Sequence, residues 1–358
     1  METINHKIEK VKEILTGRKI AISFSGGADS TLLAYLAKDV CEDVLLITYD
    51  NCIMPSGFLD FARKKASQLG IKHEIIENNF VDISEFVENT SNRCYVCRKL
   101  MYSAIKQIAN DKSYQIIMDG TNINDLVEDR PGILVNYDEN IVSPFIIAKL
   151  ESDEIHKYLD ENNIEYSKAT TCLGTRIKTG EKITADKINR ISYCEDIIKD
   201  IVKSDEIRLR EENNIGTIEI KDVENIIDNK KINQIKDQLK PMDYDKLLLN
   251  ISYDNKQNPI ANFTKDSISN KIVFEKDLPY KINLESSYQN LENKNNKFIT
   301  RYLEDIGFIS LEFENKEKIT IFKTGKITGH NFNSKESGKN SLINVLTQIR
   351  REKIEEKK

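Results

Sequence analysis

Residues 20–36 read IAISFSGGADSTLLAYL, and this stretch decides the fold of the N-terminal part of the chain. The apolar run that begins at Ile20 is typical of a buried parallel strand, and the apolar residues after the glycines are typical of a helix. A strand that turns through two glycines into a helix presents backbone N–H groups and the positive end of the helix dipole to an anion. Ser25 and Ser30 add hydroxyl donors, and Asp29 can hold Mg²⁺ against the same phosphates. The stretch therefore predicts a phosphate-binding loop.

The spacing of the loop separates it from the common nucleotide motifs. No lysine follows the glycines, so it is not GxxxxGK[ST], and it is not GxGxxG either. It resembles the SGGxDS pyrophosphate loop of the ATP pyrophosphatase (PP-loop) superfamily. Those enzymes adenylate a carboxylate or carbonyl oxygen, release pyrophosphate, and let a nucleophile displace AMP. A Gly-Gly turn in an α/β protein that binds no nucleotide is the alternative.

Composition sets the outer limits of the interpretation. A chain of 358 residues is long enough for two or three domains. The net charge of -5 gives no overall basic signature for nucleic acid, so a nucleic-acid partner is not expected. No apolar run is long enough to cross a bilayer and the N-terminus has no signal-peptide layout, so we expect a cytoplasmic protein without membrane contact. The six cysteines are accordingly not expected to form a disulfide framework.

The order of apolar runs predicts an α/β fold for the first domain, residues 1–165. Short apolar runs alternate with amphipathic stretches, which is typical of a doubly wound parallel sheet. The phosphate loop would then lie at the carboxyl edge of that sheet, where Asp50 and the stretch 119–122 also end strands. The expected strands are 19–24, 43–49, 72–77 and 114–119, and the expected helices lie near 5–16, 29–38, 56–69 and 96–110.

The remaining chain is predicted to form two further units. Residues 166–255 are expected to be a small α+β domain, and residues 256–358 a C-terminal α+β module. A turn at 323–326 followed by a helix resembles a small βαβ-like appendage. The elements expected after the first sheet are helices at 151–163 and 184–203, a loop at 167–182, strands at 206–210, 217–221, 244–251, 311–313 and 319–322, a helix at 340–350, polar loops at 258–259 and 292–296, and a charged tail at 350–358.

Three cysteines form a second group of interest. Cys94 and Cys97 have CxxC spacing just before a helix, which suits a redox pair, a zinc half-site or an iron–sulfur half-site. No second CxxC follows and the chain has only 4 histidines, so a closed zinc site lacks ligands. With Cys172, three thiolates would hold a [4Fe–4S] cluster with one iron open to an extra sulfide; three loop thiols that never meet are the alternative. The other cysteines are expected to be small buried residues: Cys41, Cys52 and Cys194.

Several stretches together resemble the LarE sulfurtransferases. These are NRCYVC (92–97), DGTN (119–122), DRPG (129–132), SPF (143–145) and CLGTRIKTG (172–180), in addition to the phosphate loop. Their order and spacing match over roughly residues 1–255. The family's last loop usually reads CLASRIPYG, so the chain keeps the thiol and the arginine but departs from the pattern at Gly174, Thr175, Lys178 and Thr179.

The resemblance implies sulfur insertion into a small-molecule substrate, pyridinium-3,5-biscarboxylic acid mononucleotide. A substrate carboxylate is adenylated with ATP and Mg²⁺, and sulfur from sulfide or another sulfur donor then replaces AMP to leave a thiocarboxylate. Two rounds give the precursor of the nickel-pincer nucleotide of lactate racemase. Family members with one cysteine sacrifice its sulfur, whereas three-cysteine members use a [4Fe–4S] cluster, and this chain has three. Some members form hexamers, so a homo-oligomer is expected by analogy.

The loop chemistry and the resemblance together give the candidate site. Arginine forks suit a substrate with a phosphate and two carboxylates, and Arg208 and Arg210, two residues apart in a strand, point to one face. A solvated basic edge is the alternative for that pair. The candidate catalytic residues are Cys172, Arg176 and Asp29; the nucleotide-binding residues are Ser23, Ser25, Gly26, Gly27, Asp29, Ser30, Tyr49, Asp50, Gly120, Thr121, Asn122 and Arg130; the substrate-binding residues are Arg176, Glu195, Arg208 and Arg210; and the cluster ligands are Cys94, Cys97 and Cys172.

Three rival functions share part of this pattern. A tRNA thiolation enzyme of the same superfamily also uses three cysteines beside the loop, but it predicts a basic face and an RNA-binding module. Ammonia-dependent ligation, as in NAD or GMP synthesis, has no use for the three cysteines. A nucleotide sensor without catalysis is disfavoured by the intact loop.

Overall fold

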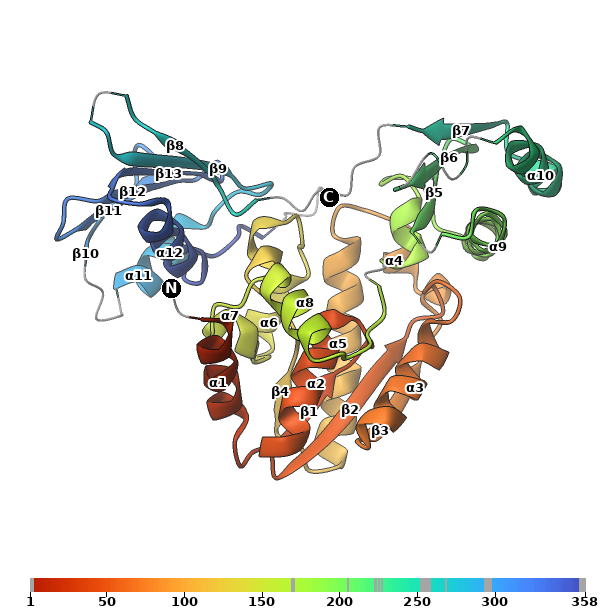
Figure 1. The fold of residues 1–358 in the computed structure, drawn as a ribbon, viewed down its shortest axis with the longest axis horizontal. Helices are drawn as coiled ribbons and strands as arrows, with labels where there is room; N and C mark the ends of the chain where they lie inside the picture. Colours follow the sequence, from red (N-terminus) through yellow and green to blue (C-terminus); the bar gives the residue numbers. More distant parts are fainter. Residues whose placement is uncertain are drawn as a thin grey trace.

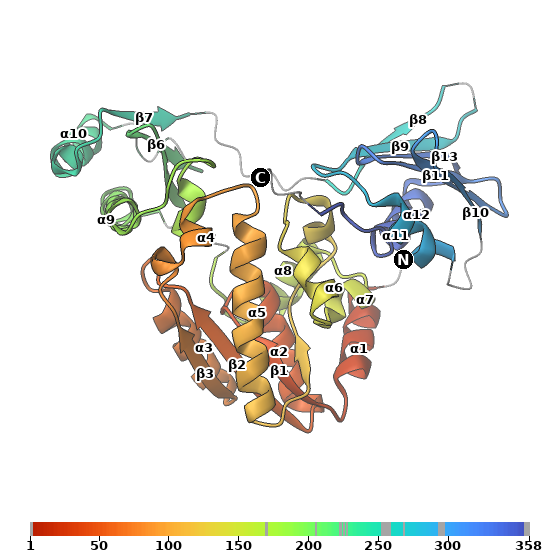
Figure 2. The ribbon, with the colours of Figure 1, turned by 180° about the vertical axis from the view of Figure 1, so that it is seen from behind.

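The computed structural model describes residues 3–168, 171–204, 206–221, 224, 226, 228–251, 259–267, 269–292 and 298–353. A parallel sheet with its helices forms the centre of the molecule, and two lobes with their own sheets stand on either side of its carboxyl end (Figures 1 and 2). We propose that the three sheets correspond to the three domains predicted from the sequence. The boundary at 255/256 lies outside the described residues.

The central sheet has the strand order β3-β2-β1-β4, and all neighbours are parallel. Ile20 and Ile22 belong to one core cluster, whereas Ala21 between them belongs to another, as alternation in a strand requires. Because all three are fully buried, both faces of the sheet are covered. The strands are β1 (Lys19–Ser23), β2 (Asp43–Asp50), β3 (Lys72–Glu77) and β4 (Ile116–Met118), which confirms the predicted strands.

Helices pack on both faces of this sheet, which confirms the predicted α/β fold. Each group of helices shares a core with alternate residues of both β1 and β2. The first group is α1 (Ile4–Leu15), α2 (Ala28–Val40), α3 (Phe58–Leu69), α7 (Pro144–Ile147) and α8 (Ser152–Glu161); the second is α5 (Arg93–Asp111) and α6 (Ile133–Asp138). Two short helices, η1 (Phe80–Asp82) and α4 (Ser84–Val87), lie between β3 and α5.

The second lobe contains the sheet β5-β6-β7. β5 and β6 form a hairpin whose turn residues, Asn213 and Asn214, both have positive φ (48° and 60°), as a type I′ turn requires. Buried Leu209 and Ile218 of the hairpin pack in one core with Ile191 of the long helix α9. The elements are η3 (Leu173–Arg176), α9 (Ala185–Val202), β5 (Ile207–Glu212), β6 (Ile215–Ile220), α10 (Asn229–Leu239), η5 (Lys240–Met242) and β7 (Lys246–Asn250).

The C-terminal lobe is a six-stranded antiparallel sheet, β10-β11-β12-β13-β9-β8, packed against two helices. The βαβ-like expectation was wrong, because strand β13 follows the turn after Phe322 and pairs with β12. The last helix begins earlier than predicted, since the Ser334 hydroxyl accepts the Ser337 N–H and caps it. The elements are β8 (Asn262–Lys265), β9 (Ile272–Asp277), α11 (Leu284–Glu292), β10 (Phe298–Leu303), β11 (Phe308–Phe313), β12 (Lys318–Phe322), β13 (Lys326–Phe332) and α12 (Lys335–Leu346).

Parts of three predicted loops and of the predicted tail lie outside the described residues. They are residues 169–170 of the loop at 167–182, residue 258 of the loop at 258–259, residues 293–296 of the loop at 292–296, and residues 354–358 of the tail. Among the helices of the described chain, none combines the length and the apolar character needed to cross a bilayer.

Candidate functional site

The phosphate loop joins the end of β1 to the start of α2. Gly26 has φ 74°, a conformation that glycine adopts without strain, and α2 begins at Ala28. The Ser25 N–H donates to the Ser30 hydroxyl oxygen (3.2 Å), and the two hydroxyls are 3.2 Å apart. The loop therefore folds back on the first turn of α2, next to backbone N–H groups that the helix itself leaves unpaired.

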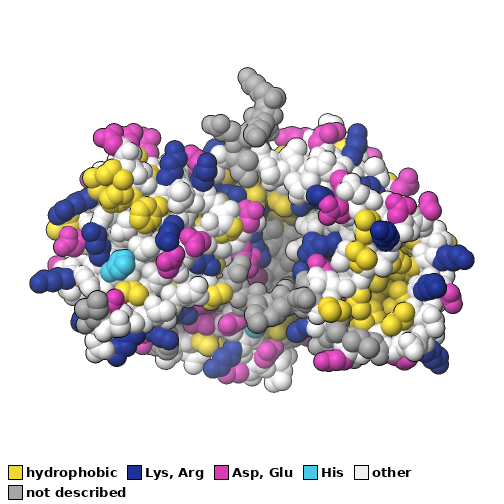
Figure 3. Space-filling view, turned by 90° about the horizontal axis from the view of Figure 1, so that it is seen from above, with side chains coloured by type: hydrophobic (Ala, Val, Ile, Leu, Met, Phe, Trp, Pro, Cys, Tyr) yellow, Lys and Arg dark blue, Asp and Glu magenta, His cyan; other side chains and the backbone are white. Residues whose placement is uncertain are grey.

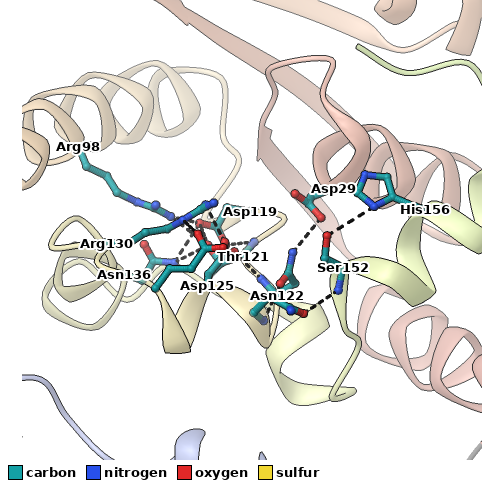
Figure 4. Close-up of polar contacts among 12 residues, drawn as sticks. Asp29, Arg98, Asp119, Thr121, Asn122, Asp125, Arg130, Asn136, Ser152 and His156 are labelled. Carbon is teal, nitrogen blue, oxygen red and sulfur yellow. Dashed lines mark hydrogen bonds and ion pairs between the residues drawn. The ribbon is translucent and has the colours of Figure 1, made fainter. Parts of the chain in front are cut away.

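A second loop, after β4, lies directly against the phosphate loop. A Cβ added to Gly120 would lie 2.7 Å from the Asp29 Cβ, so only glycine permits this approach. The Asn122 amide donates to Asp29 Oδ1 (3.0 Å; Figure 4). Burial, together with the negative charge of Asp125, raises the pKa of Asp29 to about 7. A divalent cation at this carboxylate would remove that penalty, since it favours the charged form.

Asp125 and Arg130 form the outer part of this loop. The Asp125 carboxylate accepts the Asn122 N–H (2.8 Å) and pairs with Arg130 Nη1 (2.6 Å), and Arg130 Nε pairs with Glu128 (2.8 Å). Asp125 is buried, which raises its pKa, whereas the Arg130 side chain is half exposed. The Arg130 charge also acts to lower the pKa of Asp29, so the arginine lies within electrostatic reach of the loop.

Asp119 is the hub of the polar network behind these loops, and the sequence interpretation did not assign it a role. Its carboxylate accepts hydrogen bonds from five side chains, of which those of Arg98, Thr121 and Asn136 are labelled in Figure 4. Burial works to raise the pKa of Asp119, but the Arg98 guanidinium and the hydrogen bonds hold it below its usual range. The donors are Arg98 Nη2 (2.5 Å), Tyr102 Oη (2.6 Å), Thr121 Oγ1 (2.6 Å), Asn136 Nδ2 (2.9 Å) and Ser143 Oγ (2.7 Å).

Three residues predicted to bind nucleotide make contacts within the protein, and only Thr121 belongs to the Asp119 network. Thr121 donates its hydroxyl to Asp119, as stated above. Tyr49 is only 4% exposed, stacks edge-on against Phe80 and accepts a hydrogen bond from Asn78 (3.0 Å). The Asp50 carboxylate accepts the Cys52 N–H (2.9 Å) and shapes the loop after β2.

The structure brings the three predicted thiols together at the start of α5. Burial raises the pKa of Cys97, and the charges of Cys172 and Cys94 raise it further. Burial raises the pKa of Cys172 as well, and Arg93 opposes that shift. Arg93, also not assigned a role from the sequence, donates to the Gly174 carbonyl (2.9 Å) and to Cys94 Sγ (3.6 Å), so it ties the CxxC turn to the loop of Cys172.

These thiols have the donor chemistry of an iron–sulfur site but not its arrangement. In the described part of the chain, no group of three or more His, Cys, Asp or Glu side chains is placed to hold a metal ion. The other cysteines differ from the sequence expectation in part. Cys194 is buried and Cys41 is half-buried, whereas Cys52 is exposed because a left-handed backbone (φ 58°) turns it outward after Asp50.

Arg176 and Glu195 form a buried ion pair rather than an open binding surface. Arg176 Nε lies 2.8 Å from Glu195 Oε1, and both side chains are 2% exposed. The same carboxylate oxygen accepts the Leu209 N–H (3.0 Å), while Arg176 Nη1 donates to Thr175 Oγ1 (3.1 Å). Glu195 therefore joins α9, β5 and the loop of Cys172, and in this structure it positions Arg176.

A pocket of about 340 Å³ lies beside this ion pair. Arg210 reaches it with a 42% exposed side chain, held by Glu219 (2.9 Å) and the Thr175 carbonyl (3.1 Å). Arg208 lies two residues away on the same strand and pairs in register with Glu219, at the half-buried face of the sheet. The lining residues are Thr175, Arg176, Ile177, Lys178, Thr179, Arg210, Glu211, Glu212 and Thr217.

Viewed from above, the molecular surface is hollowed between the C-terminal lobe and the second lobe (Figure 3). Lys and Arg side chains occur on both sides of this hollow, interspersed with Asp and Glu. The described surface there has no single sign of charge, which differs from an extended nucleic-acid footprint.

Comparisons with known proteins agree with this architecture. Residues 18–131 match a family of unknown function, DUF7411. The chain is 31% identical over 241 residues to the uncharacterized protein MJ0830 of Methanocaldococcus jannaschii, covering 67% of this chain and 92% of that protein. It is 32% identical over 203 residues to the uncharacterized protein slr1717 of Synechocystis sp., covering 56% and 75%.

A more distant relative carries a named activity. The chain is 24% identical over 207 residues to the pyridinium-3,5-bisthiocarboxylic acid mononucleotide synthase of Lactiplantibacillus plantarum, covering 57% of this chain and 75% of that protein. Matches at lower similarity include a glutamine-hydrolyzing GMP synthase and a tRNA(Ile)-lysidine synthase. These relatives support an ATP-dependent enzyme of the PP-loop superfamily.

Proposed function

Because the chain belongs to the family of the uncharacterized protein MJ0830, within the ATP-dependent PP-loop enzymes, we propose that it is a sulfurtransferase acting on a carboxylated mononucleotide. The proposed substrate is pyridinium-3,5-biscarboxylic acid mononucleotide, the proposed product its thiocarboxylate, and the proposed pathway the synthesis of the nickel-pincer cofactor. The observation that supports the proposal most is that Cys94 and Cys172 lie close enough to Cys97 for their charges to raise its pKa, with Cys172 on the loop whose Arg176 lines a pocket together with Arg210.

The first step would be adenylation of the substrate. A carboxylate oxygen of the substrate attacks the α-phosphorus of ATP, and pyrophosphate leaves. The loop from Ser25 to Ser30 offers backbone N–H groups and hydroxyls to the phosphates, and Asp29 would hold Mg²⁺ against them. Asn122 fixes the Asp29 carboxylate for that task.

The second step would be sulfur transfer. Sulfide, supplied as a co-substrate and held near Cys172, would attack the acyl carbon of the adenylate; the C–O bond to AMP breaks, AMP leaves, and the sulfide sulfur stays on the acyl carbon as a thiocarboxylate. Arg176 would stabilise charge near the acyl group, and Arg210 offers a guanidinium to the phosphate or the second carboxylate. When bound by the three cysteines, a [4Fe–4S] cluster would supply an open iron that carries sulfide.

The test is an anaerobic assay of the full chain. Protein reconstituted with iron and sulfide is incubated with MgATP, sulfide and the biscarboxylated mononucleotide, and the products are weighed by mass spectrometry. We expect one or two replacements of oxygen by sulfur, dependent on MgATP, lost in Cys172→Ala and retained in Cys41→Ala. A [4Fe–4S] absorption band that is retained in the Cys41 variant and lost in Cys94→Ala would support the cluster.

The second candidate is thiolation of tRNA by the same chemistry. It is favoured by the C-terminal lobe, which stands across the hollow from the substrate pocket, and by the similarity to a tRNA(Ile)-lysidine synthase. AMP formation that requires added tRNA, with sulfur recovered in the RNA, would replace the mononucleotide proposal. AMP formation with neither product would contradict both.

A further inference from the structure

The C-terminal lobe packs on the loop that carries Asp125 and Arg130. Four apolar residues of this loop region belong to the same buried core as the β-sheet of the lobe. They are 7% exposed or less, so the loop and the lobe share one hydrophobic interior. The four residues are Ile123, Leu126, Val127 and Ile133.

Two polar side chains of the lobe reach the same loop. The Tyr280 hydroxyl donates to the Leu126 carbonyl, which lies in the short helix η2 (Asn124–Val127). A carbonyl at the end of a helix lacks an intrahelical partner, so Tyr280 satisfies a buried acceptor. Arg351 pairs with Asp129 (2.9 Å), and its guanidinium lies over the Tyr280 ring (4.9 Å).

These contacts continue into the nucleotide site. Leu126 follows Asp125, whose carboxylate holds the Asn122 N–H, and the Asn122 amide in turn holds Asp29. Asp129 precedes Arg130, which pairs with Asp125 (2.6 Å). A displacement of η2 would move Asp125, which holds both Asn122 and Arg130. It would therefore also shift these two side chains, which act on the Asp29 carboxylate.

We propose that Tyr280 and Arg351 are positioning residues for the nucleotide site, and that the C-terminal lobe sets the affinity for MgATP through the loop 122–132. The inference rests on the proposed use of ATP, but not on the sulfur chemistry or on the identity of the substrate. It gives the lobe a role within the enzyme in place of a role as a detached appendage.

Other contacts hold the lobe to the first domain without touching this loop. Lys339 of α12 pairs with Glu151 (2.6 Å), which caps α8. Lys353 pairs with Asp138 (3.3 Å) at the end of α6. Docking of the lobe is thus separable from its contacts with η2, and Lys339 offers a matched control.

The test compares Tyr280→Phe, Arg351→Met and Lys339→Met in the full-length protein. Tyr280→Phe removes one oxygen, and Arg351→Met keeps the apolar stem, so both variants are expected to fold. The dissociation constant for MgATP is measured by calorimetry, and hydrogen exchange of residues 122–132 is measured without nucleotide. We expect the first two variants to bind MgATP roughly three- to tenfold more weakly and to exchange faster at 122–132, because Tyr280→Phe leaves the Leu126 carbonyl without its donor and Arg351→Met removes the ion pair that ties Asp129 to the lobe. Lys339→Met should match the wild type in both measurements.

Each other outcome overturns a specific statement. If wild type binds MgATP and the Tyr280 and Arg351 variants match Lys339→Met in binding or in exchange, the lobe is only a scaffold. If wild type does not bind MgATP, the proposed function fails, and the positioning role fails with it. If all three variants weaken binding equally, general docking of the lobe replaces the specific role of Tyr280 and Arg351.

Discussion

The nucleotide half and the sulfur half of the candidate site are held in different ways. Around Asp119, donors from α5, α6 and two loops converge on one buried carboxylate. Around the thiols, the contacts are fewer: Arg93 reaches Cys94, and Cys97 contacts Met101 (3.6 Å). Both oxygens of the Asp119 carboxylate accept several hydrogen bonds, which holds this side chain in one geometry, although Arg98 Nε and Asn136 Oδ1 beside it lack a partner among the described residues. Thiols with weak partners leave more room for rearrangement.

The difference suggests how the two halves would meet their ligands. The phosphate loop and the Asp119 network would receive MgATP with little change. The thiols would have to move to bind iron or to present sulfur, since the described residues contain no arrangement ready for a metal. Substitutions in the first half should therefore affect stability and nucleotide binding together, and substitutions of the thiols should affect chemistry alone.

The largest expected effect is that of Cys172→Ala, which should abolish sulfur transfer but leave nucleotide binding unchanged. Cys172→Ala should lower thiocarboxylate formation by roughly 10³ or more, because the sulfur-bearing group is gone. The dissociation constant for MgATP should stay within about twofold of wild type, since no contact of the phosphate loop changes. Product mass spectrometry and calorimetry check the two statements. A Cys172→Ala protein that still makes thiolated product would remove this residue from the mechanism.

Asp119→Asn should give the largest loss of stability in the nucleotide half. The asparagine amide keeps the shape of the side chain but leaves the Arg98 guanidinium, whose side chain is 24% exposed, without its charge partner, which costs about 3 kcal/mol, the low end for a buried pair. Glu161→Gln, in an exposed ion pair with Lys157, should change the free energy of unfolding by less than about 0.5 kcal/mol. Urea unfolding at pH 7 measures both, and equal effects would show that the Asp119 network is not a hub.

The lowered pKa of the Asp119 carboxylate predicts that the stability of the protein falls at acidic pH. The pKa of Asp119 is lower in the folded protein than in the unfolded chain, so its contribution is present above the unfolded value of about 3.9. That contribution is lost as the pH falls through the folded pKa. Unfolding free energies measured from pH 6 to pH 3 should therefore fall more steeply for wild type than for Asp119→Asn. Parallel curves would contradict a depressed pKa.

The titration of Asp29 should change the stability of the protein with pH in the direction opposite to that of Asp119, and by a smaller amount. The pKa of Asp29 is raised to about 7, so the stability linked to its protonated form is present below about pH 4 and is lost as the pH rises through 7. Without Mg²⁺, the free energy of unfolding of Asp29→Asn should rise relative to that of wild type by on the order of 2 kcal/mol as the pH increases from 5 to 8. MgATP should reverse this order by stabilising wild type alone, because only the carboxylate can hold the cation. Thermal unfolding at several pH values, with and without MgATP, provides the measurement.

The first domain could be read from the sequence because its signals are local. Alternating apolar runs fix the strands, and the glycines at 26 and 27 fix the turn into α2. The thiols could be grouped as candidates, but their meeting depends on Arg93 and on a carbonyl 81 residues away in sequence, which no local pattern reveals. The exposure of Cys52 was not predicted because the residue was interpreted as the flank of a buried strand, whereas the backbone after Asp50 and Asn51 takes a left-handed conformation at this residue.

The Asp119 network and the Arg176–Glu195 ion pair were not predicted, because their members lie far apart in the sequence. Asp119 ends a short strand, and its partners lie on α5, on α6 and after α6. Glu195 lies inside a helix whose pattern predicts only a polar face, so its burial with Arg176 could not be foreseen. The C-terminal sheet was predicted only in part, because β8, β9 and β10 are largely exposed and carry weak apolar patterns.

The smallest expected effect distinguishes the two arginines of the pocket. Arg210 has a 42% exposed side chain and an ion pair with Glu219, so Arg210→Gln should shift the midpoint of thermal unfolding by only about 1–3 °C. Its guanidinium is the one of the two that reaches the pocket from an accessible side chain, so the same variant should raise the KM for the mononucleotide about tenfold while kcat changes little. Arg176→Gln breaks a pair in which both partners are 2% exposed, so it should lower stability by about 3–5 kcal/mol. If Arg210→Gln left KM unchanged and Arg176→Gln raised it at full stability, Arg176 would be the substrate ligand and the pocket would have to open toward it.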